Sequence, residues 1–203
     1  MKLYSSPVAP SPRKVLIFIA EKGIENIEVE NLDIGKMEHK TPEYKEIAPN
    51  SRIPALVLDD GEVILETTAI CRYLECLNPE PNLFGTNPDE IAQIEMWYSR
   101  ISFELMMPLM HGFRHTHPHM SALEDQNTEF GLAQRELALK SMKYYDSVMD
   151  GKDFIACNKF SYADIQAVTS LQFLVRLNKI NIEDYENLSR YTNDIGSRPS
   201  FSA

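Results

Sequence analysis

Three observations on the sequence predict an α/β domain followed by an all-α domain. Strand and helix patterns alternate through residues 1–79. Residues 80–88 are rich in Pro, Asn and Gly, which form turns and mark domain boundaries. From residue 89 onward the apolar residues recur at helical spacing, and no good strand hairpin is found. We therefore expect an α/β domain over residues 1–79, a linker over 80–88 and a helical domain over 89–203.

The first part of the chain is expected to form a strand, a loop, a helix and a second strand. Residues 2–4 form a minimal strand, and prolines break the loop over residues 5–12. Residues 15–19 then supply the apolar face of a helix that stops at Gly23, a residue type common just after helix ends. Residues 27–32 alternate apolar and polar side chains, which indicates a half-exposed strand.

The next stretch is expected to hold one helical turn at residues 42–47 and then a hairpin. Residues 55–58 and 63–65 are apolar and partly β-branched, as buried strands require. Gly61 lies in the connection between them and is free to take a positive φ. After residue 65 the apolar period becomes helical and predicts a helix that reaches Leu77.

Four helices are expected beyond the linker, at residues 91–105, 132–148, 161–177 and 180–197. Pro108 is expected to end the first of these helices. Ser161 followed by Asp164 resembles a capping box, so its expected role is in folding.

Composition and charge exclude several classes of function. The net charge of −10 argues against nucleic acid or an anionic membrane as the main partner. No apolar run is long enough to cross a bilayer, no signal segment opens the chain, and three cysteines without a C-x-x-C pair indicate a reducing, cytoplasmic location. His111, His115, His117 and His119 match no zinc spacing, so no metal is expected.

Two segments, residues 51–56 (Ser-Arg-Ile-Pro-Ala-Leu) and 65–74 (Leu-Glu-Thr-Thr-Ala-Ile-Cys-Arg-Tyr-Leu), resemble a known family. They are similar to the glutathione-binding half of cytosolic glutathione S-transferases, especially bacterial, theta- and nu-like members. The resemblance implies the fold of that family, a thioredoxin-like domain followed by an all-α domain. It also implies that Pro54 is cis and that the Ile53 backbone pairs with the cysteinyl part of glutathione like an added strand.

The same resemblance implies which residues bind the two ends of glutathione. It implies that Glu66 and Thr67 hold the γ-glutamyl end, although Thr67 taken alone also fits an ordinary helix N-cap. His39 and Arg52 are candidates for the glycyl carboxylate, and the alternative is that each is simply solvated. Such a ligand carries two carboxylates, so an acidic protein needs positive groups to bind it.

The expected catalytic residue departs from the pattern of the resemblance. Transferases of this family lower the pKa of the glutathione thiol, because the thiolate is the nucleophile. Many bacterial relatives place the donor to the thiolate where this chain has Ala9, which has no side-chain donor. Ser11 is our candidate, beside the N–H groups and positive dipole of the first helix. Ser11 also fits a residue that only shapes the loop; Ser5, Ser6 and Tyr4 are further alternatives, Tyr4 being best explained by packing.

The resemblance implies a homodimeric, cytoplasmic transferase for detoxification, in which a glutathione thiolate attacks a small electrophile. Glutathione is then a co-substrate, and no metal takes part. A glutathione-dependent disulfide reductase and a non-catalytic interaction module of the same fold are the alternatives. Ala9 favours both alternatives, whereas the intact Ile53-Pro54 and Glu66-Thr67 pairs disfavour the module.

Overall fold

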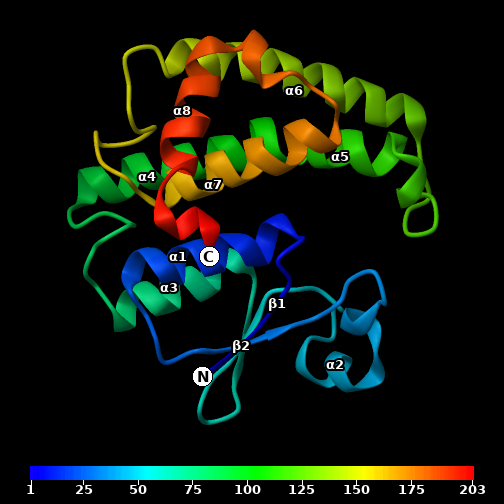
Figure 1. The fold of residues 1–203 in the computed structure, drawn as a ribbon, viewed down its shortest axis with the longest axis vertical. Helices are drawn as coiled ribbons and strands as arrows, with labels where there is room; N and C mark the ends of the chain where they lie inside the picture. Colours follow the sequence, from blue (N-terminus) through cyan, green and yellow to red (C-terminus); the bar gives the residue numbers. More distant parts are fainter. The chain divides into compact units, whose positions relative to one another are not determined.

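The computed structural model describes residues 1–203, which form two compact units. The first contains Met1–Leu83 together with Pro199–Ala203, and the second contains Phe84–Arg198. The first unit is α/β and the second is helical (Figure 1), so the predicted order of the two classes is confirmed.

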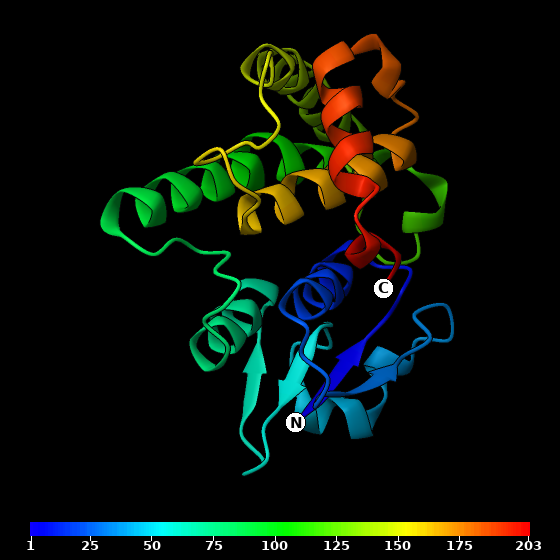
Figure 2. The same ribbon diagram turned by 60° about the vertical axis from the view of Figure 1, so that its left-hand side comes forward.

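The first unit is built on a mixed four-stranded sheet in the order β2-β1-β3-β4 (Figure 2). Strand β1 pairs parallel to β2 and antiparallel to β3, which pairs antiparallel to β4. Its elements are β1 (Lys2–Ser5), α1 (Pro10–Lys22), β2 (Glu28–Asn31), α2 (Pro42–Ile47), β3 (Ala55–Val57), β4 (Val63–Leu65), α3 (Thr67–Leu77) and the 3₁₀ turns Glu38–Lys40 and Pro199–Ser202.

Helix α1 begins at Pro10, so the prediction that residues 5–12 form a loop is wrong at its end. Proline is tolerated in a first helical turn, because the N–H group it lacks has no partner within the helix there. The helix ends as predicted at Gly23, whose φ of 62° is left-handed. Ser11 therefore lies inside the first turn of α1 and not in the preceding loop.

Neighbouring residues of β1 pack on opposite faces of the sheet. Successive side chains on a strand point to opposite faces. On β1, Tyr4 packs with Tyr44 of α2, with their ring centroids 5.5 Å apart, and with Ala55. The fully buried Leu3 therefore points to the opposite face.

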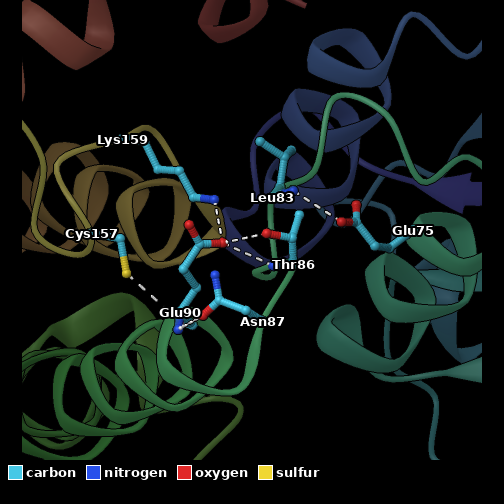
Figure 3. Close-up of polar contacts among 7 residues, drawn as sticks. All are labelled: Glu75, Leu83, Thr86, Asn87, Glu90, Cys157 and Lys159. Atoms are coloured by element: carbon cyan, nitrogen blue, oxygen red, sulfur yellow. Dashed lines mark hydrogen bonds and ion pairs between the residues drawn. The ribbon is translucent and has the colours of Figure 1, made fainter.

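A buried ion pair joins α1 to α3, which pack against each other. Lys22 Nζ lies 2.6 Å from Glu75 Oε2, and their side chains are only 0% and 9% exposed. Lys22 also donates to the Pro81 carbonyl at 2.7 Å. Glu75 Oε1 accepts from the Leu83 N–H at 2.9 Å, as Figure 3 shows. The extra hydrogen bonds offset the cost of removing two charges from water, and they fix the chain that follows α3.

The second unit consists of helices joined by turns and loops, including the loop of residues 149–161 between α6 and α7 (Figure 1). No helix of the chain is long and apolar enough to span a membrane. The elements are α4 (Pro88–Arg100), a π-helical turn (Ile101–Met106), α5 (Met107–Thr116), a 3₁₀ turn (Pro118–Met120), α6 (Thr128–Val148), α7 (Tyr162–Ser170), a second π-helical turn (Leu171–Val175), a 3₁₀ turn (Ile182–Asp184) and α8 (Glu186–Gly196).

The prediction that a helix ends at Pro108 is wrong. The chain passes from α4 through the π-helical turn directly into α5, where Pro108 is the second residue. Proline removes one N–H donor and crowds the carbonyl four residues earlier. A π-helical turn over that carbonyl lets the helix continue with an altered hydrogen-bond pattern.

Asp164 fixes the start of α7 through the predicted capping box. Its Oδ2 accepts from the Ser161 N–H at 2.8 Å and from Ser161 Oγ at 2.9 Å. Its Oδ1 accepts from the Ile155 N–H at 2.9 Å and from Tyr191 Oη at 2.8 Å. Burial raises the pKa of Asp164 to about 6, although all four donors favour the carboxylate. The role in folding expected from the sequence is thus supported.

Glu90 organises the beginning of the second unit (Figure 3). Its Oε2 accepts from Lys159 Nζ at 2.6 Å and from the N–H and Oγ1 of Thr86, both at 2.9 Å. Lys159 and then Thr86 lower the pKa of this carboxyl to about 2. Gly85 is required just before, because its φ is +95° and a Cβ would lie 2.6 Å from the Ile91 nitrogen.

Candidate functional site

The candidate site lies where the ends of all four strands meet at one end of the sheet. The register pairs Ser5 with Asn31, Tyr4 with Ala55, and Ala55 with Leu65. The carboxyl ends of β1, β2 and β4 and the amino end of β3 therefore lie together. Helices α1 and α3 begin shortly after β1 and β4, so both N-termini are delivered to this end, which is where open α/β sheets commonly bind ligands.

Ile53 offers an unpaired stretch of backbone at this end. Its peptide bond to Pro54 is cis, as the resemblance implied. Pairing along β3 starts only at Ala55, and no backbone hydrogen bond within the chain uses the Ile53 N–H or C=O. The preceding residue is held by Tyr44, whose hydroxyl donates to the Arg52 carbonyl at 2.7 Å. An extended peptide can therefore pair with Ile53 as an added strand.

Glu66 stands at the start of α3 in an unusual backbone conformation. Its φ is 71° and its ψ 127°, a region that residues with a side chain rarely occupy. Its carboxylate is exposed and takes part in no hydrogen bond or ion pair. Such a conformation costs about 1–3 kcal/mol and persists where the surrounding structure imposes it, often at a binding site.

Thr67 is the first residue of α3, so the alternative that it is an ordinary N-cap is not what the structure shows. The N-cap position belongs to Glu66, whose side chain makes no cap hydrogen bond. Thr67 Oγ1 donates only a long bond of 3.4 Å, to the Ser11 carbonyl. The uncapped helix N-terminus and the Thr67 hydroxyl together form a place where a carboxylate is favoured.

Ser11 is the second residue of α1, and its neighbours make it the main donor of the first turn. Pro10 and Pro12 have no N–H, and the Arg13 N–H bonds to the Ala9 carbonyl at 3.3 Å. The Ser11 N–H is thus the one backbone donor of this turn left unbonded. Because Thr67 donates to its carbonyl, Ser11 also lies directly beside the start of α3.

The alternatives to Ser11 are less accessible. Ser5 and Ser6 are 0% and 1% exposed, and Ser5 Oγ has no hydrogen-bond partner. Tyr4 packs into the cluster around Tyr44, in agreement with the packing role expected for it. Ser11 is half-buried and therefore remains open to a ligand.

His39 and Arg52 are not joined to the other candidates by any hydrogen bond or ion pair. His39 lies in the 3₁₀ turn Glu38–Lys40, before α2, and its Nδ1 is buried without a partner. Burial, and then the charge of Lys40, lower the pKa of His39, so the imidazole is neutral at pH 7. The Arg52 side chain is exposed and forms no ion pair within the chain.

The site has the chemistry to bind a charged peptide. It combines open backbone at Ile53, a carboxylate at Glu66, two helix N-termini and the cationic side chain of Arg52 directly before Ile53 in the sequence. No group of three or more metal-ligating side chains comes together in the chain. The three cysteines are all free and lie at positions 71, 76 and 157, so none belongs to the first turn of α1.

Two features of the site were not anticipated from the sequence. Tyr44 holds the backbone before Ile53, but its helical spacing with Ile47 is typical of an ordinary core residue. The positive φ of Glu66 was also missed, because glycine is the usual sequence signal for that conformation.

Two family models match the chain and cover most of it. The model described as the glutathione S-transferase N-terminal domain matches residues 8–77. The model described as the glutathione S-transferase C-terminal domain matches residues 98–199. The first match includes every residue that we place at the candidate site.

Similar proteins extend over the full length of the chain. Glutathione S-transferase 2 of Saccharomyces cerevisiae is 34% identical over 98% of this chain and 87% of its own. The crystal structure of Gtt2 from Saccharomyces cerevisiae superposes with a TM-score of 0.89 and covers 100% of this chain and 99% of its own. A class Gtt2 glutathione S-transferase of Vibrio parahaemolyticus, 30% identical, has a TM-score of 0.86 and covers 100% and 96% of the two chains.

Proposed function

The chain belongs to the glutathione S-transferase family, and as a glutathione transferase we propose that it joins glutathione to small electrophilic molecules. In the proposed reaction the enzyme holds glutathione as its thiolate. The sulfur forms a bond to an electrophilic carbon, and the leaving group departs with the electron pair of its own bond. The observation that carries the proposal is the convergence of Ser11, Ile53, Glu66 and Thr67 at one end of the sheet.

Glutathione is proposed to lie along this end in an extended conformation. The Ile53 N–H and C=O pair with the cysteinyl residue. Glu66 binds the α-amino group of the γ-glutamyl residue, and Thr67 with the N-terminus of α3 binds its carboxylate. This division matches charge to charge: the free carboxylate of Glu66 faces a cation and the helix N-terminus faces an anion.

The glycyl carboxylate is assigned to His39 and Arg52. The Arg52 guanidinium, exposed and without an internal partner, supplies the positive charge. His39 is neutral in the free protein and donates a hydrogen bond through the ring nitrogen other than its buried Nδ1.

The thiolate is proposed to be stabilised by the first turn of α1. The Ser11 hydroxyl and N–H both donate toward the sulfur, and the positive end of the helix dipole favours the anion. One charged hydrogen bond contributes about 1.5–3 kcal/mol. Since one pKa unit corresponds to about 1.36 kcal/mol, a net stabilisation of this size, shared between the two donors, lowers the thiol pKa by roughly one to two units.

The proposal includes three further expectations: a cytoplasmic location, a role in detoxification and a homodimer. Self-association is supported by large apolar side chains that are exposed on the second unit. Phe103 in the π-helical turn is 74% exposed, and Met96 of α4 and Leu137 of α6 are 41% and 48% exposed. Sedimentation equilibrium of the wild type and of Phe103→Ser tests this, with dissociation expected for the variant.

The test of the function compares three activities of one preparation. We expect the protein to be retained on immobilised glutathione, to conjugate a chromogenic aryl halide, and to reduce a glutathione mixed disulfide slowly or not at all. Reduction without conjugation would establish the disulfide reductase alternative. A folded protein with no retention and neither activity would be the non-catalytic module and would overturn the proposal.

A further inference from the structure

The first turn of α1 lacks the features that normally stabilise a helix start. Its N-cap is Ala9, which forms no side-chain cap, and the turn has no acidic residue. Arg13 places a positive charge at the positive end of the helix dipole. The resulting turn suits a bound anion, but within α1 itself little fixes its position.

The last five residues of the sequence supply contacts that α1 lacks. The Arg13 guanidinium donates through Nη2 to the Phe201 carbonyl. Near the other end of α1, Ser200 Oγ donates to Glu21 Oε1 at 2.5 Å. Ser200 and Phe201 are only 7% and 4% exposed, and both views show the end marked C beside α1 (Figures 1 and 2).

We propose that Arg13 is a positioning residue for the transferase reaction. Its bond to the Phe201 carbonyl holds the first turn of α1, so that the Ser11 N–H and hydroxyl stay aimed at the glutathione sulfur. Arg13 acts through Ser11, two residues away, and does not itself touch the sulfur. The inference rests on the proposed function and adds to it that residues 199–203 complete the glutathione-binding unit.

The experiment compares Arg13→Ala, Arg13→Lys and a chain that ends at Arg198 with the matched control Ser200→Ala. The control removes the contact near the far end of α1 and leaves Arg13 in place. We expect Arg13→Ala and the shortened chain to move the pH profile of kcat/KM for the electrophile, measured at saturating glutathione, to higher pH. At about pH 6.5 this lowers conjugation about two- to ninefold, because a rise of about half to one unit from a thiol pKa of about 6.5–7.5 lowers the thiolate fraction by that factor.

The KM for glutathione should hardly change in these variants, Arg13→Lys should recover part of the activity, and Ser200→Ala should keep the wild-type profile. A purely structural role predicts lower melting temperatures with unchanged pH profiles, and that result would overturn the inference. Equal shifts in Arg13→Ala and Ser200→Ala would do the same. If Ser11→Ala shifts the profile and Arg13→Ala does not, only this inference fails; if Ser11→Ala shifts nothing, the proposed role of Ser11 fails and this inference with it.

Discussion

Replacing Glu66 by glycine separates its role in binding from its role in folding. Glu66 has a φ of 71° without being glycine, and its carboxylate has no partner in the chain. Glycine adopts this conformation without steric cost. The substitution therefore removes the proposed contact to the α-amino group of glutathione while it relieves the backbone.

The two effects differ in sign and size. The backbone conformation costs about 1–3 kcal/mol with a side chain present. Glycine also lowers the free energy of unfolding by about 0.5–1 kcal/mol, because it gives the unfolded chain greater conformational freedom. The free energy of unfolding of Glu66→Gly should therefore equal that of the wild type or exceed it by up to about 2.5 kcal/mol. Loss of the charged hydrogen bond should weaken glutathione binding by about 1.5–3 kcal/mol, roughly 10- to 150-fold in Kd.

Calorimetric titration with glutathione and urea unfolding measure the two quantities. Glu66→Gln is the matched control, because it keeps the size and the strained backbone and removes only the charge. It should lose affinity like Glu66→Gly but show no gain in stability. Unchanged affinity together with a loss of stability in Glu66→Gly would refute the binding role and make Glu66 a structural residue.

Three further predictions follow from charged groups. His39 has a lowered pKa, and a bound carboxylate should raise it, so His39 should take up protons when glutathione binds near and below pH 6.5. Ionisation of the thiol releases protons in the wild type and in His39→Gln alike, so calorimetry in buffers of different ionisation enthalpy should show more proton uptake, or less release, in the wild type than in His39→Gln. Burial raises the pKa of Asp164 from 3.8 to about 6 in the folded protein, so the contribution of this group to the free energy of unfolding falls as pH rises from about 4 to 6. In urea unfolding, Asp164→Asn should remove this pH dependence and lower the free energy of unfolding at pH 7 by about 1–3 kcal/mol for each buried donor left unpaired. Glu75→Leu leaves the Lys22 charge buried and should cost about 3–5 kcal/mol of unfolding free energy, most of which Lys22→Met should restore in the double variant.

The sequence was sufficient for the elements that local periodicity determines. Apolar, partly β-branched runs on either side of Gly61 predicted the hairpin of β3 and β4, and a single helical turn was expected where α2 lies. The resemblance at residues 51–56 predicted the cis bond before Pro54. Each of these features depends on neighbours within a few residues, which is the range that sequence patterns describe.

The sequence was not sufficient where proline fits two local structures or where a contact joins distant residues. Pro108 indicated a helix end, but a π-helical turn before it lets the helix continue. Pro10 and Pro12 suggested a loop where α1 begins, because both helix starts and loops favour proline. The bond from Arg13 to the Phe201 carbonyl spans 188 positions and leaves no trace in local spacing.

The pKa of the thiol of bound glutathione is the most direct test of the proposed mechanism. It is read from the ultraviolet absorbance of the thiolate across a pH titration of the saturated complex, for the wild type and for Ser11→Ala. We predict that the wild type holds the thiol about one to two units below the ordinary value of about 8.5, and that Ser11→Ala recovers about one unit of that shift. A bound thiol that titrates like free glutathione in the wild type would contradict the account.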